Sequence, residues 1–338
     1  MTTNKPRFGE AKKVIIVPEN IELSVAKHET ILAAALTQKL NLPHSCKNGG
    51  CGACKCKVIS GEITLDQYNK AVLTDEELLQ GYTLLCKAHP QGDVVLDMPN
   101  LLNSFPIKTL PAKVEKIEKM GDVAILSLKL PFNQNFGFYA GQYIEIILQG
   151  KNRCYSIANN PNQASIVEIH VRYYKSGIFS EFVWNELQEK QILRFKGPLG
   201  SFQLSSNHNK STIFICTGTG FAPIKAMLQD IAAKNIKRNL YIYWGNRTVN
   251  DFYLLDALRD LQRQLNFKLT LCTSRESVAG FTSGYVTNAF INDFADLHDY
   301  EIYACGNLKM IEDVYLLAIK EHGLDKQSFF SDAFIPSV

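Results

Sequence analysis

Three regions with different spacing of hydrophobic and polar residues follow one another along the chain. In the first region, short apolar runs that indicate strands lie at residues 14–17, 21–25, 57–63 and 93–98. The first two of these runs are close enough to pair as a hairpin. Helical spacing covers residues 31–40, with Thr30 as N-cap, and Thr74 with Glu77 forms a capping box that opens a second helix. The first region therefore predicts a small domain that mixes strands and helices.

The second region is dominated by strands. Apolar runs separated by turn residues lie at 112–118, 123–130, 142–148, 154–158, 166–171 and 191–195. A single helix, expected at 180–187, interrupts them. Short strands joined by turns in this way predict a small antiparallel barrel.

Strands and helices alternate in the third region. The strands are expected at 212–216, 239–244, 267–272, 301–304 and 327–330. Between the first two, Ile224, Met227, Leu228 and Ile231 recur at helical spacing. This alternation predicts a parallel sheet covered by helices, which binds ligands at the carboxyl ends of its strands.

Domain boundaries follow from these patterns. Asparagine, serine and three prolines interrupt the periodicity at residues 99–111. We predict a multidomain protein of mixed α+β and α/β class, with domains at 11–100, 108–205 and 210–338. Three domains suit a chain of 338 residues.

The composition is that of an ordinary globular protein and excludes several classes of function. The 36 basic and 33 acidic residues leave a formal charge of +3, which argues against a nucleic-acid or membrane-surface role. Residues 1–13 are polar and basic without an apolar core, which argues against a secretory signal. No run approaches the about 18 apolar residues of a membrane helix. With nine cysteines, an odd number, we expect a cytoplasmic protein with metal-bound or buried thiols rather than a disulfide scaffold.

Four cysteines carry the strongest chemical signal. Cys46, Cys51 and Cys54 have the C-x4-C-x2-C spacing of plant-type [2Fe–2S] sites, whose fourth cysteine lies far downstream. Cys86 is at such a position. A structural zinc site is the alternative, but zinc sites usually show two paired cysteine knuckles, whereas Cys86 stands alone. The spacing therefore predicts an iron–sulfur cluster.

The residues between these cysteines suit a tightly wrapped loop. Gly49, Gly50 and Gly52 accept positive φ values and leave no Cβ in the way, so that backbone N–H groups can turn toward the sulfurs. Cys56 is a rival ligand, but it begins the following strand and breaks the spacing. We therefore expect Cys56 to be a buried thiol.

Several lysines lie beside the expected ligands, namely Lys47, Lys55, Lys57 and Lys87. A cluster held by thiolates is anionic, so nearby lysines stabilise its reduced form. Lys47, Lys55 and Lys87 are also candidates for a basic rim that docks an acidic acceptor protein. For any single lysine, an ordinary solvated loop is the alternative.

A short motif on one barrel strand introduces a resemblance to a known family. Arg153, Tyr155 and Ser156 spell R-x-Y-S, which resembles the flavin motif of the ferredoxin–NADP reductase superfamily. The resemblance implies that Arg153 binds the FAD pyrophosphate, Tyr155 packs against the isoalloxazine and Ser156 lies near its reactive nitrogen. A guanidinium suits phosphate and an aromatic face suits a flat ring, which supports these roles.

The segment after the next barrel strand extends the resemblance. His170, Val171 and Arg172 precede Gly177 and Ser180, which open the expected helix, and the resemblance makes all five candidates for cofactor binding. A helix N-terminus offers N–H donors and the positive end of its dipole to an anion, and the family places the FAD pyrophosphate there. An ordinary N-cap is the alternative for Ser180, and His170 is expected to pack within its strand rather than act as a base.

The first turn of the third region adds a nucleotide site. Residues 217–223 read T-G-T-G-F-A-P, which differs from the G-x-G-x-x-G fingerprint but resembles the nicotinamide-side loop of the same family. Cys305 is expected to abut the nicotinamide, and a core thiol at a strand end is its alternative. The resemblance assigns nucleotide binding to Thr217, Gly218, Thr219, Gly220, Gly245, Cys305 and Gly306.

The coenzyme preference depends on the ends of two other strands. No acidic residue ends the second strand of the third region to hold a ribose 2′-hydroxyl, as in ordinary NAD-binding folds. Ser274 and Arg275 end the third strand, where NADPH-using relatives carry a serine and an arginine for the 2′-phosphate. Relatives with the three-module order of this chain more often use NADH, so NADH is preferred here. For Arg275, a solvated side chain is the alternative.

The resemblance covers nearly the whole chain and implies its fold and activity. It implies a β-grasp [2Fe–2S] ferredoxin domain, an antiparallel FAD-binding barrel and a parallel-sheet NAD(P)-binding domain. Electrons are expected to pass from NAD(P)H through FAD, which is stable in three redox levels, to the one-electron cluster and then to a partner enzyme. Ser156, Cys305 and Phe334 are the candidate residues around hydride transfer, with Phe334 covering the flavin as a lid that must shift.

The identity of the acceptor has two leading alternatives. Several stretches, including residues 329–334, most closely resemble CDP-6-deoxy-Δ3,4-glucoseen reductases of dideoxysugar biosynthesis, whose acceptor is an iron–sulfur dehydratase. The alternative is the reductase component of an aromatic-ring or alkane oxygenase. A free flavin reductase and a non-enzymatic electron carrier are further alternatives, and the intact R-x-Y-S and G-T-G-x-A-P loops argue against the last.

Overall fold

The computed structural model describes residues 11–98, 105–163, 165–205 and 209–334. The chain divides into two compact units, residues 1–107 and 108–338. The predicted domain boundaries, at 11–100, 108–205 and 210–338, stay a prediction. Among the described residues, no helix is long and apolar enough to cross a membrane.

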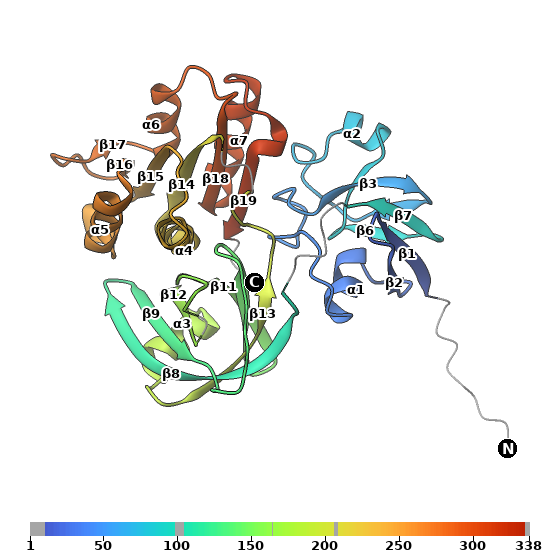
Figure 1. The fold of residues 1–338 in the computed structure, drawn as a ribbon, viewed down its shortest axis with the longest axis horizontal. Helices are drawn as coiled ribbons and strands as arrows, with labels where there is room; N and C mark the ends of the chain where they lie inside the picture. Colours follow the sequence, from blue (N-terminus) through green and yellow to red (C-terminus); the bar gives the residue numbers. More distant parts are fainter. Residues whose placement is uncertain (1–10, 99–104, 164, 206–208, 335–338) are drawn as a thin grey trace. The chain divides into compact units, whose positions relative to one another are not determined.

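The first unit is built on a mixed five-stranded sheet of order β2-β1-β7-β3-β5 (Figure 1). β1 and β7 are parallel, and the other neighbours are antiparallel. A separate antiparallel pair joins β4 and β6. The strands are β1 (Lys12–Val17), β2 (Ile21–Val25), β3 (Lys55–Ser60), β4 (Ile63–Leu65), β5 (Tyr82–Leu84), β6 (Ala88–Pro90) and β7 (Val94–Asp97).

Both helices of this unit begin at the caps expected from the sequence. α1 (Ile31–Thr37) starts after Thr30, whose Oγ1 accepts a hydrogen bond from Ala33 N at 3.2 Å. α2 (Asp75–Leu79) starts at the complete capping box of Thr74 and Glu77. α1 is shorter than predicted, because Lys39 adopts a left-handed φ of 63° just beyond the last turn.

The second unit begins with a six-stranded antiparallel sheet of order β11-β10-β13-β8-β9-β12. A bridge between Ile157 and Ile169 links the two edge strands, so the sheet closes into the predicted barrel. α3 (Ile178–Asn185) follows β12 and packs Phe179 and Val183 into the barrel core. The strands are β8 (Lys108–Met120), β9 (Val123–Lys129), β10 (Tyr143–Leu148), β11 (Lys151–Ser156), β12 (Ile166–Arg172) and β13 (Ile192–Leu199).

The rest of this unit is the predicted parallel sheet, of order β17-β16-β15-β14-β18-β19. The strands are β14 (Ser211–Thr217), β15 (Leu240–Asn246), β16 (Lys268–Thr273), β17 (Thr282–Ser283), β18 (Tyr300–Asn307) and β19 (Phe329–Phe334). The order turns around between β14 and β18, and such a switch point leaves a crevice at the carboxyl ends of the strands.

Helices cover both faces of the parallel sheet (Figure 1). α4 and α5 pack together on one face, and α6 and α7 on the other. Their bounds are α4 (Phe221–Ala233), α5 (Leu255–Leu265), α6 (Val286–Asp293) and α7 (Leu308–Lys320). Short 3₁₀ turns cover Gly218–Gly220, Val249–Asp251 and Lys326–Ser328.

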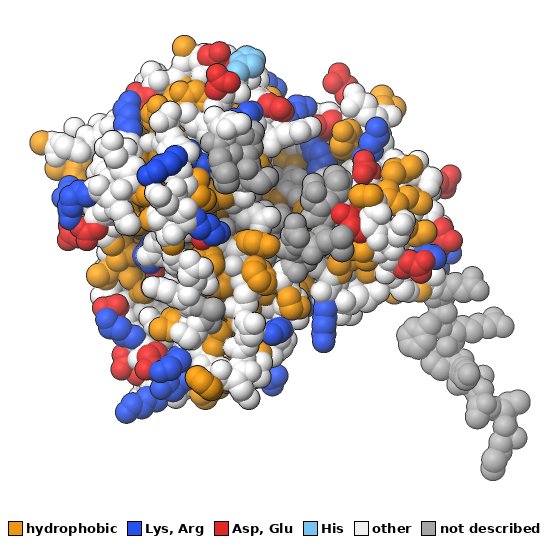
Figure 2. All heavy atoms as spheres, in the orientation of Figure 1, with side chains coloured by type: hydrophobic (Ala, Val, Ile, Leu, Met, Phe, Trp, Pro, Cys, Tyr) orange, Lys and Arg blue, Asp and Glu red, His pale blue; other side chains and the backbone are white. Residues whose placement is uncertain are grey.

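Surface charges are mixed in sign. On the face shown in Figure 2, basic and acidic side chains are interspersed. Along β8, Lys113 pairs with Glu115 at 2.7 Å and Lys116 with Glu118 at 2.6 Å. This balance agrees with the formal charge of +3.

Candidate functional site

The loop between α1 and β3 carries three of the four predicted cluster ligands. Gly49 and Gly52 adopt φ values of 83° and 74°, which residues with a Cβ rarely adopt. A Cβ on Gly49 would also lie 2.9 Å from the Cβ of Tyr68. Gly50 does not adopt a positive φ, so the expectation is wrong for this residue, whereas Lys47 does, with φ 59°.

The sulfur atoms of the four cysteines lie in two close pairs. The Sγ atoms of Cys54 and Cys86 are 3.3 Å apart; the side chains of Cys46 and Cys51 are hydrogen-bonded to each other, and Cys46 N–H also donates to Cys51 Sγ at 3.4 Å. Gly50 N–H donates to Cys46 Sγ, also at 3.4 Å, so backbone donors do turn toward the sulfurs. Within the described ranges, no three His, Cys, Asp or Glu side chains form a closed metal site. A [2Fe–2S] centre divides four thiolates between two irons, and two pairs of thiols fit that division.

The pKa values of these thiols reflect the pairing. The hydrogen bond with Cys51 lowers the pKa of Cys46 to about 5. The hydrogen bond with Cys86, together with burial, raises the pKa of Cys54. The hydrogen bond with Cys54 lowers the pKa of Cys86; charge on Cys46 acts in the opposite direction, so the two pairs lie within electrostatic reach of each other.

Cys56 stays apart from these pairs. It lies in β3 with 6% of its surface exposed, and burial raises its pKa to about 12. The prediction of a buried thiol is therefore confirmed. All nine cysteines are free thiols in the structure, in line with the absence of a disulfide scaffold.

The lysines near the loop differ in their surroundings. Lys55 Nζ forms an ion pair with Glu77 Oε2 at 2.8 Å, and both side chains are largely buried. This ion pair compensates the charge of Lys55 within the fold and argues against its place in a basic rim, which stays a prediction. Lys47 and Lys87 are half-buried, and the Lys87 side chain lies across Gly49.

β11 positions the R-x-Y-S motif. Side chains alternate along a strand, so Arg153 and Tyr155 share one face and the exposed Cys154 lies on the other. The Tyr155 ring lies 5.2 Å from that of Phe179 on α3, and burial raises the pKa of Tyr155. Arg153 Nη1 donates to Asn152 O at 2.9 Å. One face thus offers a cation and an aromatic ring, the two groups that the flavin motif requires.

Ser156 contacts a carboxylate that the sequence analysis missed. Its Oγ donates to Asp332 Oδ2 at 3.3 Å. Asp332 is 6% exposed and lies on β19 beside Cys305 of β18. Burial, and then the neighbouring Asp332, raise the pKa of Cys305, which is a neutral thiol. The structure therefore brings Ser156 and Cys305 to the same carboxylate, although only the F-S-D-A-F tail pattern signalled it.

The start of α3 differs from the prediction. The helix begins at Ile178 with Gly177 as N-cap, so Ser180 lies inside its first turn. Ser180 Oγ accepts from Tyr174 N at 3.1 Å and donates to Tyr174 O at 3.0 Å. An N-cap role for Ser180 is therefore wrong, because its hydroxyl ties the preceding loop to the helix.

His170 and Val171 are buried in β12. His170 Nδ1 contacts Tyr253 Oη at 2.7 Å, and its Nε2 contacts Glu168 Oε1 at 2.9 Å. His170 thus packs within the fold, as expected. Both ring nitrogens have protein partners, which leaves the imidazole no atom for a cofactor.

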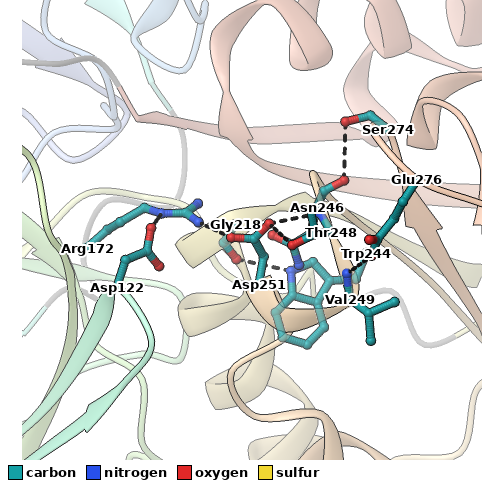
Figure 3. Close-up of polar contacts among 10 residues, drawn as sticks. All are labelled: Asp122, Arg172, Gly218, Trp244, Asn246, Thr248, Val249, Asp251, Ser274 and Glu276. Atoms are coloured by element: carbon teal, nitrogen blue, oxygen red, sulfur yellow. Dashed lines mark hydrogen bonds and ion pairs between the residues drawn. The ribbon is translucent and has the colours of Figure 1, made fainter.

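Arg172 reaches the nucleotide side from the end of β12. Its Nε donates to Asp122 Oδ2 at 2.7 Å, and its Nη2 to Asp251 Oδ1 at 3.0 Å (Figure 3). Its Nη1 would lie 2.7 Å from a Cβ on Gly218, which itself has a φ of 54°. Arg172 therefore packs against the nucleotide loop, the turn Gly218–Gly220, and its guanidinium is bound by the carboxylates of Asp122 and Asp251.

The carboxyl ends of β14 and β18 approach each other closely. A Cβ on Gly220 would lie 2.3 Å from Cys305 O, and a Cβ on Gly306 would lie 2.4 Å from Thr217 Oγ1. Thr217 Oγ1 also accepts from Asn307 N at 3.0 Å. Close contacts at the switch point thus require a glycine both at Gly220, in the turn after β14, and at Gly306 of β18.

A cavity of about 850 Å³ opens at these strand ends, a size typical of ligand sites. Tyr174, Arg247 and Tyr285 line it and were missed by the sequence analysis. Gly220 and Cys305 are buried, and Arg275 is exposed. The predicted residues that line the cavity are Arg172, Thr217, Gly218, Thr219, Gly245, Ser274, Gly306 and Phe334.

Asn246 is a further residue that the sequence analysis missed. It ends β15, lines the cavity and is 8% exposed, and within the described residues its Nδ2 has no hydrogen-bond partner. Ser274 Oγ donates to the backbone oxygen of Asn246 at 3.3 Å (Figure 3). The sequence shows that no acidic residue ends this strand, and Asn246 was assigned no role; its Nδ2 offers a donor to a dinucleotide.

Comparisons with known proteins agree with this arrangement. Three family models match in sequence order: the 2Fe-2S iron-sulfur cluster binding domain at 14–91, the oxidoreductase FAD-binding domain at 111–204 and the oxidoreductase NAD-binding domain at 214–315.

Relatives match over almost their whole length. CDP-6-deoxy-L-threo-D-glycero-4-hexulose-3-dehydrase reductase of Yersinia pestis is 38% identical, over 95% of this chain and 97% of the relative. The reductase component of propane 2-monooxygenase from Gordonia sp. (strain TY-5) is 31% identical, over 97% and 98%. The crystal structure of the Amycolatopsis cytochrome P450 reductase GcoB has a TM-score of 0.78 and 26% identity, covering 96% of this chain and 99% of that one.

Domain order, site geometry and relatives lead to one conclusion. The chain carries domains for a [2Fe–2S] cluster, FAD and a nicotinamide nucleotide. It belongs to the ferredoxin–NADP reductase superfamily, in the group with an N-terminal [2Fe–2S] ferredoxin domain, and is an NAD(P)H-dependent flavoprotein oxidoreductase that transfers electrons to a partner.

Proposed function

We propose that this reductase supplies electrons to an iron–sulfur dehydratase acting on a nucleotide-linked deoxysugar; the Yersinia relative is named as the reductase of a dehydrase of such a sugar. The observation that carries the electron route is the hydrogen bond between Ser156 of the barrel and Asp332 of the parallel sheet. It joins the strand that carries the flavin motif to the edge of the nucleotide cavity, which Phe334 lines. The greater identity to the dehydrase reductase, 38% against 31%, favours the deoxysugar acceptor over an oxygenase.

The residues of the barrel are proposed to hold the flavin. FAD held there would supply the link between two-electron and one-electron chemistry: it would take a hydride, which is a proton with two electrons, from the reduced nicotinamide and pass the electrons on singly. Arg153 binds its pyrophosphate, Tyr155 packs against the ring and Ser156 lies near the site of hydride transfer. Phe334 shields this site from water and shifts when the nicotinamide enters.

The role of Ser156 has a direct test. Ser156→Ala removes the hydroxyl that contacts Asp332, so we expect the limiting rate of flavin reduction by NADH to fall about tenfold to a hundredfold through loss of positioning. Stopped-flow absorbance of the bound flavin measures this rate. Cys154→Ala, two residues earlier on the same strand, is the control and should react like the parent. An unchanged rate in Ser156→Ala would remove Ser156 from the site.

The first unit is proposed to hold the cluster through two pairs of cysteines. Cys46 and Cys51 would bind one iron, and Cys54 and Cys86 the other, following the pairs of sulfurs in the structure. A cytoplasmic location suits this set, because thiols stay reduced there.

The last parts of the proposal are the choice of coenzyme and the residues that dock the acceptor protein. NADH is the proposed donor, since Ser274 Oγ already donates to Asn246 O and Arg275 is exposed. Because Glu77 neutralises Lys55, we propose that Lys47 and Lys87 dock the acidic acceptor.

A comparison of acceptors tests the proposed function. The purified holoenzyme is assayed for NADH and NADPH oxidation with the Yersinia dehydrase and its sugar nucleotide, or with the remaining components of propane 2-monooxygenase. We expect turnover with the dehydrase, faster with NADH, and slower as salt screens the lysines. Turnover with the monooxygenase components alone would overturn the deoxysugar assignment in favour of an oxygenase partner.

A further inference from the structure

A buried polar network joins the barrel to the parallel sheet within the unit 108–338. Glu168 Oε1 on β12 accepts a hydrogen bond from Lys225 Nζ of α4 at 2.8 Å and contacts His170 Nε2 at 2.9 Å. Lys225 Nζ also donates to Ala158 O at 3.1 Å. His170 Nδ1 contacts Tyr253 Oη at 2.7 Å. Because Nε2 donates to the carboxylate, Nδ1 accepts from the tyrosine hydroxyl.

The network contains charged side chains that are largely shielded from solvent. The side chains of His170, Lys225 and Glu168 are 0%, 10% and 21% exposed. Burial works to raise the pKa of Glu168, but His170 and Lys225 outweigh it and lower that pKa to about 2. Burial lowers the pKa of His170, which is therefore neutral at pH 7. Glu168 and Lys225 thus form an ion pair whose rupture leaves a charge in a poorly solvated place.

Tyr253 and Lys225 connect the network with the nucleotide loop. Tyr253 packs edge-on against Trp244, with ring centroids 5.8 Å apart, and Trp244 stacks on Phe221 at 4.2 Å. Trp244 Nε1 donates to Gly218 O at 3.0 Å (Figure 3). Lys225 belongs to the helix that follows this loop directly. Two routes therefore connect Glu168 with the turn Gly218–Gly220, one through rings and one through α4.

On the other side, the network holds the flavin strand. Ala158, whose carbonyl accepts from Lys225, lies two residues after Ser156. Its N–H donates to Glu168 O at 2.8 Å, beside the bridge that closes the barrel. Lys225 and Glu168 thus both hydrogen-bond to the backbone of Ala158 and hold the end of the strand that carries the R-x-Y-S motif.

We propose that Glu168, Lys225, His170 and Tyr253 are positioning residues that set the distance between the flavin strand β11 and the nucleotide loop Gly218–Gly220. This inference rests on the proposed assignment of FAD and nicotinamide to these two elements. Hydride transfer requires the reacting atoms to approach within about 3–3.5 Å, so a small shift between the elements slows it steeply. The network touches neither ligand and acts through the backbone of both elements.

The test uses the full-length holoenzyme and three variants: Lys225→Met, Glu168→Gln and the double variant. We expect the limiting rate of flavin reduction by NADH to fall about tenfold to a hundredfold in each, while the Kd for NADH changes little. The long-wavelength charge-transfer absorbance of the flavin–nicotinamide complex should weaken in parallel. The double variant should be little slower than the single ones, because both changes break one interaction.

Hydrogen–deuterium exchange gives a readout without turnover. In the NADH-free protein, backbone amides of residues 218–221 should exchange faster in Lys225→Met than in the parent. The matched control is Lys116→Met, which removes a lysine of β8 whose ion pair with Glu118, at 2.6 Å, leaves both side chains exposed. This control should leave both the rate of flavin reduction and the exchange unchanged.

The outcomes separate this inference from the proposed function. If Lys225→Met does not retain FAD, Tyr253→Phe carries the test, since it removes only the hydroxyl that contacts His170. A folded variant that is reduced as fast as the parent, with unchanged exchange, overturns the positioning role. A parent enzyme that NADH does not reduce at all would instead overturn the proposed function.

Discussion

Cys54→Ser is expected to abolish electron delivery to a protein acceptor while NADH still reduces the flavin. Cys54 is buried and its sulfur lies 3.3 Å from that of Cys86, so the change removes one member of a proposed pair of iron ligands. A serine hydroxyl is a harder and less acidic ligand than a thiol, so it holds iron of a sulfur cluster poorly. Electrons then have no carrier between the flavin and the partner, and acceptor reduction should fall to the background of the assay.

Iron content, the visible spectrum and electron paramagnetic resonance after reduction measure the cluster in this variant. Reduction of ferricyanide by NADH should persist, because small oxidants take electrons from the flavin. Cys56→Ser is the matched control: the thiol is two residues away and also buried, yet lies outside the sulfur pairs, and the variant should keep its iron. Loss of iron in Cys56→Ser but not in Cys54→Ser would contradict the ligand set, and acceptor reduction without iron would favour a free flavin reductase.

Gly306→Ala is expected to lower kcat/KM for NADH about a hundredfold, the cost of misplacing a reacting group by about 1 Å. Gly306 has a φ of 125°, and a Cβ there would lie 2.4 Å from Thr217 Oγ1 and 2.8 Å from Thr217 O. The backbone oxygen cannot rotate away, so β14 and β18 must separate where the nucleotide loop begins. FAD and iron contents should remain normal, because neither proposed site includes this contact.

Gly280→Ala separates backbone strain from this clash. Gly280 also has a positive φ, 86°, but nothing lies within 4 Å of a Cβ there. Gly280→Ala should lose about 1–2 kcal/mol of unfolding free energy, the cost of a left-handed residue, and Gly306→Ala should lose more, because the clash adds to the backbone strain. Steady-state kinetics with NADH should therefore be normal in Gly280→Ala and poor in Gly306→Ala. Normal kinetics in Gly306→Ala would show that the strand ends do not position the coenzyme.

The sequence predicted most of the elements because their signals are local. Thr74 and Glu77 form the expected capping box three residues apart, and the alternation of strands and helices after residue 211 does produce a parallel sheet. The start of α3 was misplaced because Gly177, which has no capping side chain, precedes a serine that resembles a cap. Such competing signals within one turn are decided by packing, here by the bonds of Ser180 to the Tyr174 backbone.

The residues of the site also divide into those with a local sequence signal and those that only packing reveals. The cysteine spacing and the R-x-Y-S and T-G-T-G motifs are contiguous patterns, so the families of cofactor were predictable from them. The partners of these motifs were not. Asp332 lies 176 residues from Ser156, and the charge of Lys55 is compensated by Glu77, 22 residues away. Asn246, a neutral amide at a strand end, was assigned no role from the sequence.

By itself, the sequence determined the order of the three cofactor domains and the residues whose spacing marks each cofactor. Only the tertiary structure decided which distant side chains complete the site. They are the carboxylate of Asp332, the two carboxylates that bind Arg172, and the ion pair of Glu168 with Lys225. The physical reason is that periodicity and capping act over a few residues, whereas these contacts form only after separate elements have packed together.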